Sequence, residues 1–282
     1  MKKSITFLFA LVVAFSLNAQ VKTPQPSPFS KTTQKVGLTD VTLEYSRPGA
    51  RGRTIFGDLV PYGKVWRTGA NANTKITFST SVTINGTTLK AGTYALYTIP
   101  NKKEWDVIFY ADASNWGNPA KWDEAKVAAK AKVLTHQLPM KVESFTITFD
   151  DLTNNSATIG MIWENTYLNI KFEVPTHKSV MASINKTMSG KPTANDFYSA
   201  AVYFKESNGD MKQAVKWINK TVELNGDKTP FWVYRQQSLI LAKSGDKKGA
   251  IKAAKKSLAG AKVAKNNDYI KMNTDSLKEW NN

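Results

Sequence analysis

The spacing of apolar residues changes once along the chain, at Pro175, and this change limits the possible folds more than any other feature. Between residues 40 and 175 apolar side chains recur at every second position, as in Val41, Leu43 and Tyr45, which is the spacing of half-buried β-strands. After Pro175 the spacing becomes about 3.6 residues, and strong helix formers replace the β-branched runs. The chain is therefore expected to contain a β domain followed by an α-helical domain.

The β part is predicted to be antiparallel, because hairpin turns separate its short strands. Asn85-Gly86 is the strongest turn signal, Asn165-Thr166 is expected to join the last two strands tightly, and one short helix is expected at residues 121–130. These features predict a sandwich or a barrel, and we take a jelly-roll-like β-sandwich over residues 35–176 as the working fold. The expected strands are residues 41–45, 75–78, 82–84, 94–99, 105–110, 145–149, 157–163 and 167–174.

The helical part, residues 177–282, contains an internal repeat. Residues 208–214 match residues 244–250 at an offset of 36. In each copy a glycine can end one helix, and Asp210 or Asp246 can cap the next. The pattern resembles the tetratricopeptide repeat, and a generic helical bundle is the alternative. The expected helices are residues 178–189, 194–207, 210–224, 230–243, 246–263 and 266–280.

The first residues are typical of a cleavable signal peptide. Lys2 and Lys3 precede an apolar run at residues 5–17, which ends at a small-residue cleavage site and is too short to span a bilayer. We expect a signal peptide over residues 1–19 and an extended, proline-containing leader over residues 20–34. This predicts export from a bacterial cytoplasm to the periplasm or, alternatively, to the extracellular medium, with no transmembrane segment in the mature chain.

The composition limits the chemistry further. The chain has no cysteine, which excludes disulfides and thiolate ligands. Residues 20–177 hold 18 Lys and Arg against 13 Asp and Glu, whereas residues 178–282 hold 19 against 9, so the helical part is the more basic. For an exported protein, the expected partners are anionic glycans, lipid headgroups or an acidic envelope protein, and nucleic acid is not expected.

Four of the five arginines lie at residues 47–67, and this cluster is the main candidate site. A guanidinium fork suits a carboxylate or a phosphate, and Tyr62 and Trp66 could stack on a sugar or a cation. The opposing interpretation is that the arginines hold a long loop together by binding its carbonyl groups, Asp58 and Glu44. The candidate ligand-binding residues are Arg47, Arg51, Arg53, Tyr62, Lys64, Trp66, Arg67, Asn71 and Trp116.

The same segment carries a family resemblance. Residues 46–71 begin Ser-Arg-Pro-Gly-Ala-Arg-Gly-Arg and end Val-Trp-Arg-Thr-Gly-Ala-Asn, and Leu-Lys-Ala-Gly-Thr-Tyr follows at residues 89–94. These motifs resemble a family of secreted bacterial proteins known as domain of unknown function 2911. The resemblance covers about residues 30–175. It implies export and a β fold, and it implies no activity and no catalytic residue.

No catalytic set emerges from the remaining residues. Trp105 and Trp163 are expected in the core, whereas Trp116 lies in a predicted loop and is expected to be exposed. The two histidines lack metal-ligand spacing, and no metal or cofactor is expected. The lysines of residues 247–265 are expected to form a solvated face or, alternatively, to contact an anionic membrane or an acidic partner.

These observations lead to the hypothesis of a two-domain envelope protein that acts as a non-catalytic binding or scaffold module. The helical repeats would offer an interaction surface to an envelope protein. The arginine cluster would hold an anionic glycan or a lipid headgroup. The alternative is a hydrolase or sugar-modifying enzyme that holds an anionic substrate with the same arginines.

Overall fold

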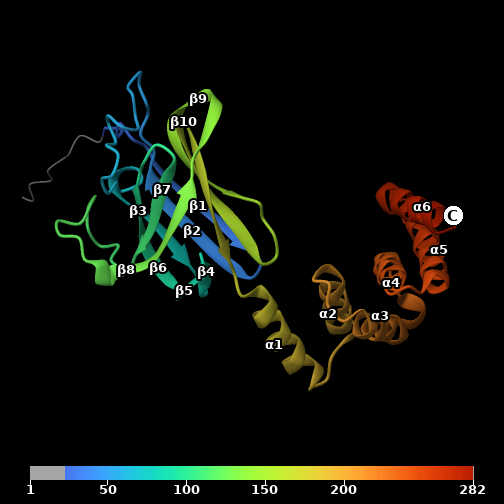
Figure 1. The fold of residues 1–282 in the computed structure, drawn as a ribbon. Helices are drawn as coiled ribbons and strands as arrows, with labels where there is room; N and C mark the ends of the chain where they lie inside the picture. The colour runs from blue at the N-terminus through green and yellow to red at the C-terminus, as the bar shows by residue number, and fades with distance from the viewer. Residues whose placement is uncertain (1–22, 282) are drawn as a thin grey trace, which may run out of the picture. The chain divides into compact units, whose positions relative to one another are not determined.

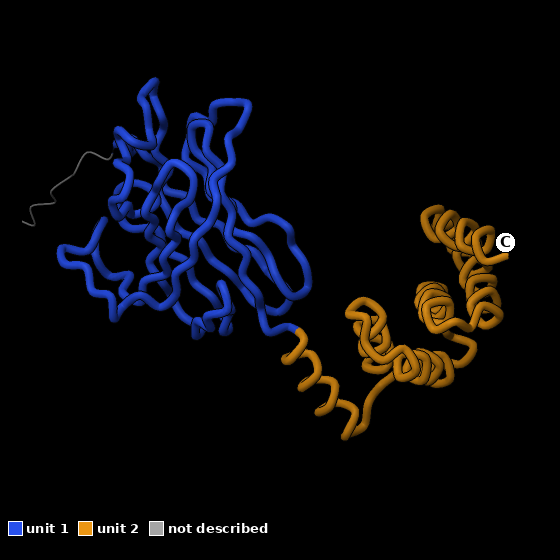
Figure 2. Tube along the Cα trace, in the orientation of Figure 1, with its two compact units in different colours: residues 1–176 blue, residues 177–282 orange. Residues whose placement is uncertain are grey.

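The computed structural model describes residues 23–281, so the predicted signal peptide, residues 1–19, lies outside the described residues. The chain divides into two compact units between Thr176 and His177 (Figure 2). In the described part of the chain, the first unit contains ten β-strands and six α-helices follow (Figure 1). This is the predicted order of β before α.

The first unit contains two antiparallel sheets. One has six strands in the order β1-β2-β3-β6-β7-β8, and the other has four in the order β5-β4-β10-β9. Asn85 and Gly86 connect β4 to β5, and both have positive φ, as the hairpin motif predicts. The strands are β1 (Phe29–Val36), β2 (Thr39–Ser46), β3 (Ala70–Phe78), β4 (Val82–Ile84), β5 (Thr87–Leu89), β6 (Gly92–Ile99), β7 (Glu104–Tyr110), β8 (Val127–Leu134), β9 (His136–Asp150) and β10 (Ser156–Glu173).

One hydrophobic core draws on both sheets. The six-stranded sheet contributes Leu43 and Ile76, and the four-stranded sheet contributes Phe172. Because successive side chains of a strand point to opposite faces, only alternate residues reach this core, which explains the period of two in the sequence. Trp105 and Trp163 are each 2% exposed, in agreement with their predicted place in the core.

The helix predicted at residues 121–130 is wrong. Only a 3-10 turn at Glu124–Lys126 is helical, and β8 follows it directly. Alanine and lysine favour helix by intrinsic propensity. However, Ala129 and Ala131 are buried and alternate with exposed lysines, and β7 pairs with this segment along its length. Pairing with a neighbouring strand therefore overrides local propensity here.

Two further segments differ from the prediction. The predicted leader, residues 20–34, overlaps β1, because residues 29–36 pair with β2 along their whole length. The tight turn predicted at Asn165-Thr166 does not form, because β10 runs through these residues without a break. The register of β10 against β9 shifts on both sides of Glu164, whose φ is 54°. Such bulges bend a strand locally, at the place where a turn was expected.

The helices begin and end close to their predicted positions. Asp210 accepts hydrogen bonds from the amides of Lys212 (2.8 Å) and Gln213 (3.2 Å), and Asp246 accepts one from the amide of Gly249 (2.8 Å). Both aspartates therefore act as N-caps, as predicted. The helices are α1 (Thr176–Met188), α2 (Ala194–Glu206), α3 (Met211–Asn225), α4 (Phe231–Lys243), α5 (Lys247–Val263) and α6 (Asn267–Asn281).

Helices α2 and α3 pack as one pair, and α4 and α5 pack as the next. Ala214 of α3 and Ala250 of α5, which the internal repeat relates, are both completely buried. At Gly260 of α5, an added Cβ would lie only 2.7 Å from the Cβ of Phe231 in α4, so a small residue permits this close approach. None of the described helices is long and apolar enough to cross a membrane.

Candidate functional site

The segment between β2 and β3, residues 47–69, contains the four clustered arginines and is called the arginine loop. Main-chain hydrogen bonds fasten it to β9: the Ala50 amide donates to the Glu143 carbonyl (2.7 Å), and the Phe145 amide donates to the Pro48 carbonyl (2.9 Å). Ala50 itself is completely buried. Because these hydrogen bonds pair backbone groups of the arginine loop with those of β9, the loop is a fixed part of the first unit.

Aromatic rings pack against the arginine loop. Trp66 stacks on Trp163, with ring centroids 5.8 Å apart and an interplanar angle of 18°. Phe56 and Phe145 each contact both indoles. Each indole N–H also donates to a main-chain carbonyl, at 3.1 Å for Trp66 and 3.0 Å for Trp163. The orientation of both indoles is therefore fixed by packing and by hydrogen bonding.

A cavity of about 350 Å³ is lined by Arg51, Arg53 and Arg67 together with the two stacked tryptophans, and we call it the arginine–tryptophan cavity. Pro26 and Ser27, from the segment ahead of β1, also line it. No carboxylate from residues 23–281 is part of this lining. The volume falls within the range of about 300–1,000 Å³ that is typical of small-molecule sites.

Within residues 23–281, none of the three guanidinium groups of the cavity forms an ion pair with a carboxylate. Arg51 donates to the Pro26 carbonyl (2.6 Å), and Arg53 donates to two carbonyls of its own loop (3.0 and 2.7 Å). The Nε of Arg67 is buried and has no hydrogen-bond partner within the described part of the chain. All ten ion pairs of the described residues are formed by lysine. None of the three guanidinium groups is therefore neutralised by a direct ion pair within the described residues, and such groups attract anions.

The backbone around the cavity is strained. Thr68, next to Arg67, has a φ of 55°, which is rare for a β-branched residue. Its hydroxyl lies 3.3 Å from the Trp66 carbonyl and 3.1 Å from the Thr98 hydroxyl, and these contacts hold the conformation. Arg51 has a φ of 52°. Residues in such conformations concentrate at binding and catalytic sites. Arg51 lines the cavity, and Thr68 directly follows Arg67, which also lines it.

Comparison with known protein families bears on this architecture. A family model described as protein of unknown function (DUF2911) matches residues 27–172, which is just over half of the 282 residues. The chain belongs to this family. The match includes the whole arginine loop, as the motif of residues 46–71 predicts, and it ends before the six helices. No curated protein and no solved structure gave a match to the chain.

Within the DUF2911 domain, the predicted site residues fall into two groups. Arg51, Arg53, Trp66 and Arg67 line one cavity and are brought together by the fold. Trp116 lies outside this cavity and is 72% exposed, as its predicted loop position implies. The other predicted site residues that do not line the cavity are Arg47, Tyr62, Lys64 and Asn71.

Some members of the second group hold the site together. Arg47 donates to a carbonyl and a hydroxyl of β9 (3.0 and 2.6 Å), and Asn71 donates to the Ser27 carbonyl (3.1 Å). Arg47, Arg51 and Arg53 all donate to carbonyl groups, as the opposing interpretation predicts, but only Arg53 binds carbonyls of the arginine loop itself. The expected ion pairs of arginine with Asp58 and Glu44 do not form among the described residues.

Sequence reasoning missed two parts of the cavity. For Trp163 the core was favoured over a carbohydrate-binding surface, yet Trp163 lies in the core and also lines the cavity. Pro26 and Ser27 were assigned to an extended leader, yet Arg51 and Asn71 bind their carbonyls. Both contributions depend on contacts between distant parts of the chain, for which the local sequence carries no signal.

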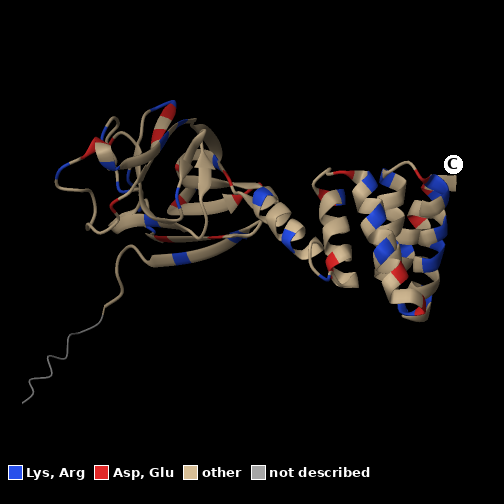
Figure 3. Ribbon diagram, turned by 90° about the horizontal axis from the view of Figure 1, so that it is seen from below, with Lys and Arg blue, Asp and Glu red and all other residues tan. Residues whose placement is uncertain are grey.

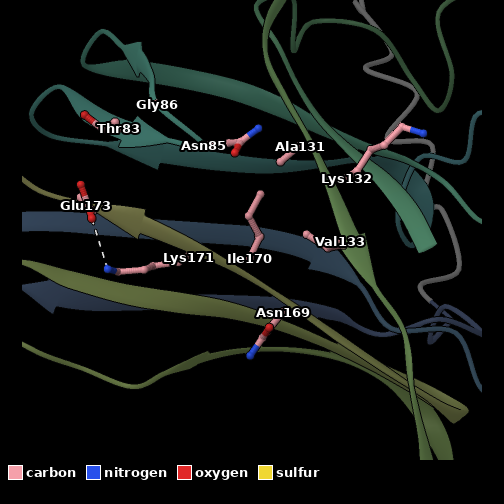
Figure 4. Close-up of a pocket in the computed structure, with 10 residues that line it drawn as sticks. All are labelled: Thr83, Asn85, Gly86, Ala131, Lys132, Val133, Asn169, Ile170, Lys171 and Glu173. Atoms are coloured by element: carbon pink, nitrogen blue, oxygen red, sulfur yellow. Dashed lines mark hydrogen bonds and ion pairs between the residues drawn. The ribbon is translucent and has the colours of Figure 1, made fainter. Parts of the chain in front are cut away.

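A second hollow of the DUF2911 domain, of about 320 Å³, is lined by β8, β10 and the β4–β5 hairpin (Figure 4). Its lysines already have acidic partners: Lys171 pairs with Glu173 (3.2 Å), and Lys132 pairs with Glu104 (3.0 Å). These internal pairs reduce the attraction of the hollow for an external anion. The arginine–tryptophan cavity is therefore the better candidate for a charged ligand.

Proposed function

We propose that this chain is an exported envelope protein whose first unit captures an anionic ligand in the arginine–tryptophan cavity. The observation that carries the proposal is the meeting of three arginines beside two stacked indoles, with no ion pair to any of these arginines in the described part of the chain. A guanidinium that gives one or two donors to neutral carbonyls keeps its full charge, and its remaining donors can bind a ligand. The sequence of residues 1–19 supports export.

An anionic glycan suits this cavity better than a small inorganic ion. The indole of Trp66 is partly exposed and offers an apolar face to the C–H surface of a sugar ring. The arginines offer planar forks to a carboxylate or sulfate group on the same sugar. A ligand that uses both features needs an apolar face and a negative charge, which an anionic sugar combines.

Hydrolysis or sugar modification is the alternative function, and it requires a suitably placed acid and base. Glu143 and Glu164 contact the arginine loop, but Glu143 accepts a hydrogen bond from the Arg51 amide (2.7 Å) and Glu164 accepts one from the Ile55 amide (3.2 Å). Both carboxylates bind the backbone of the loop, and neither lines the cavity. The geometry therefore supports capture better than hydrolysis.

A glycan array, probed with the purified chain, tests the proposal. We expect glycans with uronate, sialate or sulfate groups to bind more tightly than their neutral counterparts. For the best ligand, Arg67→Ala should weaken binding by about tenfold or more, because it removes a charged hydrogen-bonding partner. Lys64→Ala is the matched control, since it removes one positive charge from the same loop outside the cavity, and it should leave the affinity nearly unchanged.

Three results would contradict or redirect the proposal. Equal binding of charged and neutral glycans, or an equal loss in the Arg67 and Lys64 variants, would show that the cavity does not select an anion. Binding of no anionic glycan would remove the proposed ligand class. Product formation that Arg67→Ala abolishes, with the fold intact by circular dichroism, would favour the enzyme.

A further inference from the structure

Helix α5 is strongly basic. Six of its 17 residues are lysine and none is acidic. None of these lysines takes part in an ion pair within residues 23–281, and Figure 3 shows basic residues recurring along the helices of the second unit. A lysine-rich helix face is ordinarily only solvated, so a binding site requires a second feature beside it.

The second feature is a groove of about 250 Å³ that is lined by α3, α4 and α5. Lys252 and Lys256 line it from α5, Asn219 lines it from α3, and Gln237 lines it from α4. The Nζ of Lys256 lies 5.0 Å from the ring centroid of Tyr234, which also lines the groove. This cation–π contact holds the ammonium group beside the groove.

The polar groups of the groove favour a peptide as its occupant. Gln237 donates to the Oδ1 of Asn219 (2.8 Å), which leaves the amide hydrogens of Asn219 and the carbonyl oxygen of Gln237 for another partner. A peptide main chain offers both a donor and an acceptor, whereas a lipid phosphate offers acceptors alone. The one acidic lining residue, Asp246, binds the Gly249 amide as the N-cap of α5.

The spacing of the two lysines predicts the pattern of the peptide. Lys252 and Lys256 are four residues apart on one helix face, a rise of about 6 Å. Side chains on one face of an extended strand are about 6.6 Å apart, because every second residue points the same way. Acidic residues at alternate positions of an extended segment therefore match the two ammonium groups.

We propose that this groove binds an extended acidic segment of a partner protein. Aspartate or glutamate side chains at alternate positions pair with Lys252 and Lys256, and the main chain of the segment binds Asn219 and Gln237. The groove lies entirely within the second unit and is built without any residue of the arginine–tryptophan cavity. Failure of either proposal therefore leaves the other intact.

Fluorescence anisotropy with the full chain and two labelled synthetic peptides tests this inference. One peptide has three glutamates at alternate positions in an alanine background, and the other has three glutamates at every third position. We expect the alternate peptide to bind about fivefold more tightly. Lys252→Gln combined with Lys256→Gln should lower the affinity for the alternate peptide by about tenfold. Lys247→Gln combined with Lys262→Gln removes the same charge from α5 outside the groove and should change affinity by less than about twofold.

Asn219→Ala separates a peptide from a membrane, because it keeps every charge. This replacement should lower the affinity for the alternate peptide by about threefold and leave the affinity for phosphatidylglycerol vesicles unchanged. Equal losses in the two double variants would overturn the proposal, since overall charge alone would then explain binding. Equal affinity for the two peptides would also overturn it. Tighter binding to the vesicles than to either peptide, lost when Lys252 and Lys256 are replaced, would assign these lysines to a membrane surface instead.

Discussion

Trp163 contributes to the core and to the cavity with one side chain. Its indole is 2% exposed and stacks on Trp66, yet it also lines the arginine–tryptophan cavity. Phe56 and Phe145 contact the same two indoles. Packed core side chains have little freedom to move, so the aromatic surface offered to a ligand is set by the packing behind it.

Replacement of Trp163 is expected to destabilise the first unit strongly. Trp163→Ala should lower the free energy of unfolding by about 3–5 kcal/mol, through lost burial and the cavity that remains. Trp116→Ala is the matched control, because Trp116 is 72% exposed, and it should change stability by less than about 0.5 kcal/mol. Urea denaturation measures both, and similar effects of the two replacements would show that the indole cluster is not a packed core.

The surface ion pair between Lys126 and Asp112 (2.7 Å) predicts that the stability of the fold depends on pH. The hydrogen bond from the Lys126 ammonium, followed by those from the Ser114 hydroxyl and amide, holds the pKa of Asp112 well below its ordinary value of 3.8. A lowered folded-state pKa stabilises the fold fully above the ordinary pKa, and this contribution is lost as the pH falls through the folded-state value. The stability difference between the parent chain and Asp112→Asn should therefore shrink as the pH falls below about 4. A difference that stays constant across this range would show that the pair contributes nothing.

Single residues show why the site could be predicted only in part. The arginine cluster and its use of carbonyl groups follow from composition and from the length of the loop. The expected partner Glu44 instead pairs with Lys31 (3.1 Å). Lys31 lies directly across from Glu44 because residues 29–36 form β1 and pair with β2. An error about one strand thus became an error about one ion pair.

Among the elements, helices α4 and α5 are followed by turns that have the same hydrogen-bond pattern. After α4, Gly245 has a φ of 92° and the Asp246 amide donates to the Leu241 carbonyl (2.9 Å). After α5, Lys265 has a φ of 52° and the Asn266 amide donates to a helix carbonyl at the same distance, 2.9 Å. Glycine is the usual residue at such a left-handed position, so Lys265 is strained where Gly245 is not.

Replacement of the strained residue is expected to stabilise the second unit. Lys265→Gly should raise the free energy of unfolding by about 0.5–1 kcal/mol, because glycine adopts positive φ without a steric penalty. Lys255→Gly makes the same change of side chain inside α5 and should lower stability by about 1 kcal/mol. Thermal unfolding followed by circular dichroism measures both. Destabilisation by Lys265→Gly would mean that the lysine side chain matters more than the backbone conformation.

Elements with a strong local signal were predicted correctly, and elements that depend on a distant neighbour were not. Helices α2, α3 and α5 have side-chain N-caps, and the helical part has a 3.6-residue period, so the bounds of the helices follow largely from local chemistry. Strands β1 and β8 have polar or alanine-rich sequences, and they exist because β2 and β7 supply their hydrogen-bond partners. Edge strands of this kind are determined by pairing rather than by propensity.

At the scale of the whole molecule, each unit has its own hydrophobic core. The core of the first unit is formed by strand residues such as Leu43 and Phe172, and a core of the second unit is formed by helix residues such as Ala214 and Ile240. Neither of these cores draws a buried residue from the other unit. Units with separate cores generally unfold as separate cooperative steps.

Calorimetry of the full chain should therefore show two unfolding transitions. Trp163→Ala should lower the melting temperature of the first unit alone. Lys265→Gly should raise the melting temperature of the second unit alone. Each shift should be several degrees per kcal/mol for units of this size. A single transition that moves as a whole in both variants would contradict this expectation and would show that the units unfold together.

The segment ahead of β1 gives the cavity a removable side. Pro26 and Ser27 line the cavity, and hydrogen bonds from Arg51 and Asn71 hold them in place. A protease that cut the chain just before Phe29 would leave the sandwich core intact while detaching this side of the cavity. Loss of Pro26 and Ser27 would therefore open one side of the cavity and weaken binding of the proposed ligand, so fusion partners for binding experiments belong at the C-terminus.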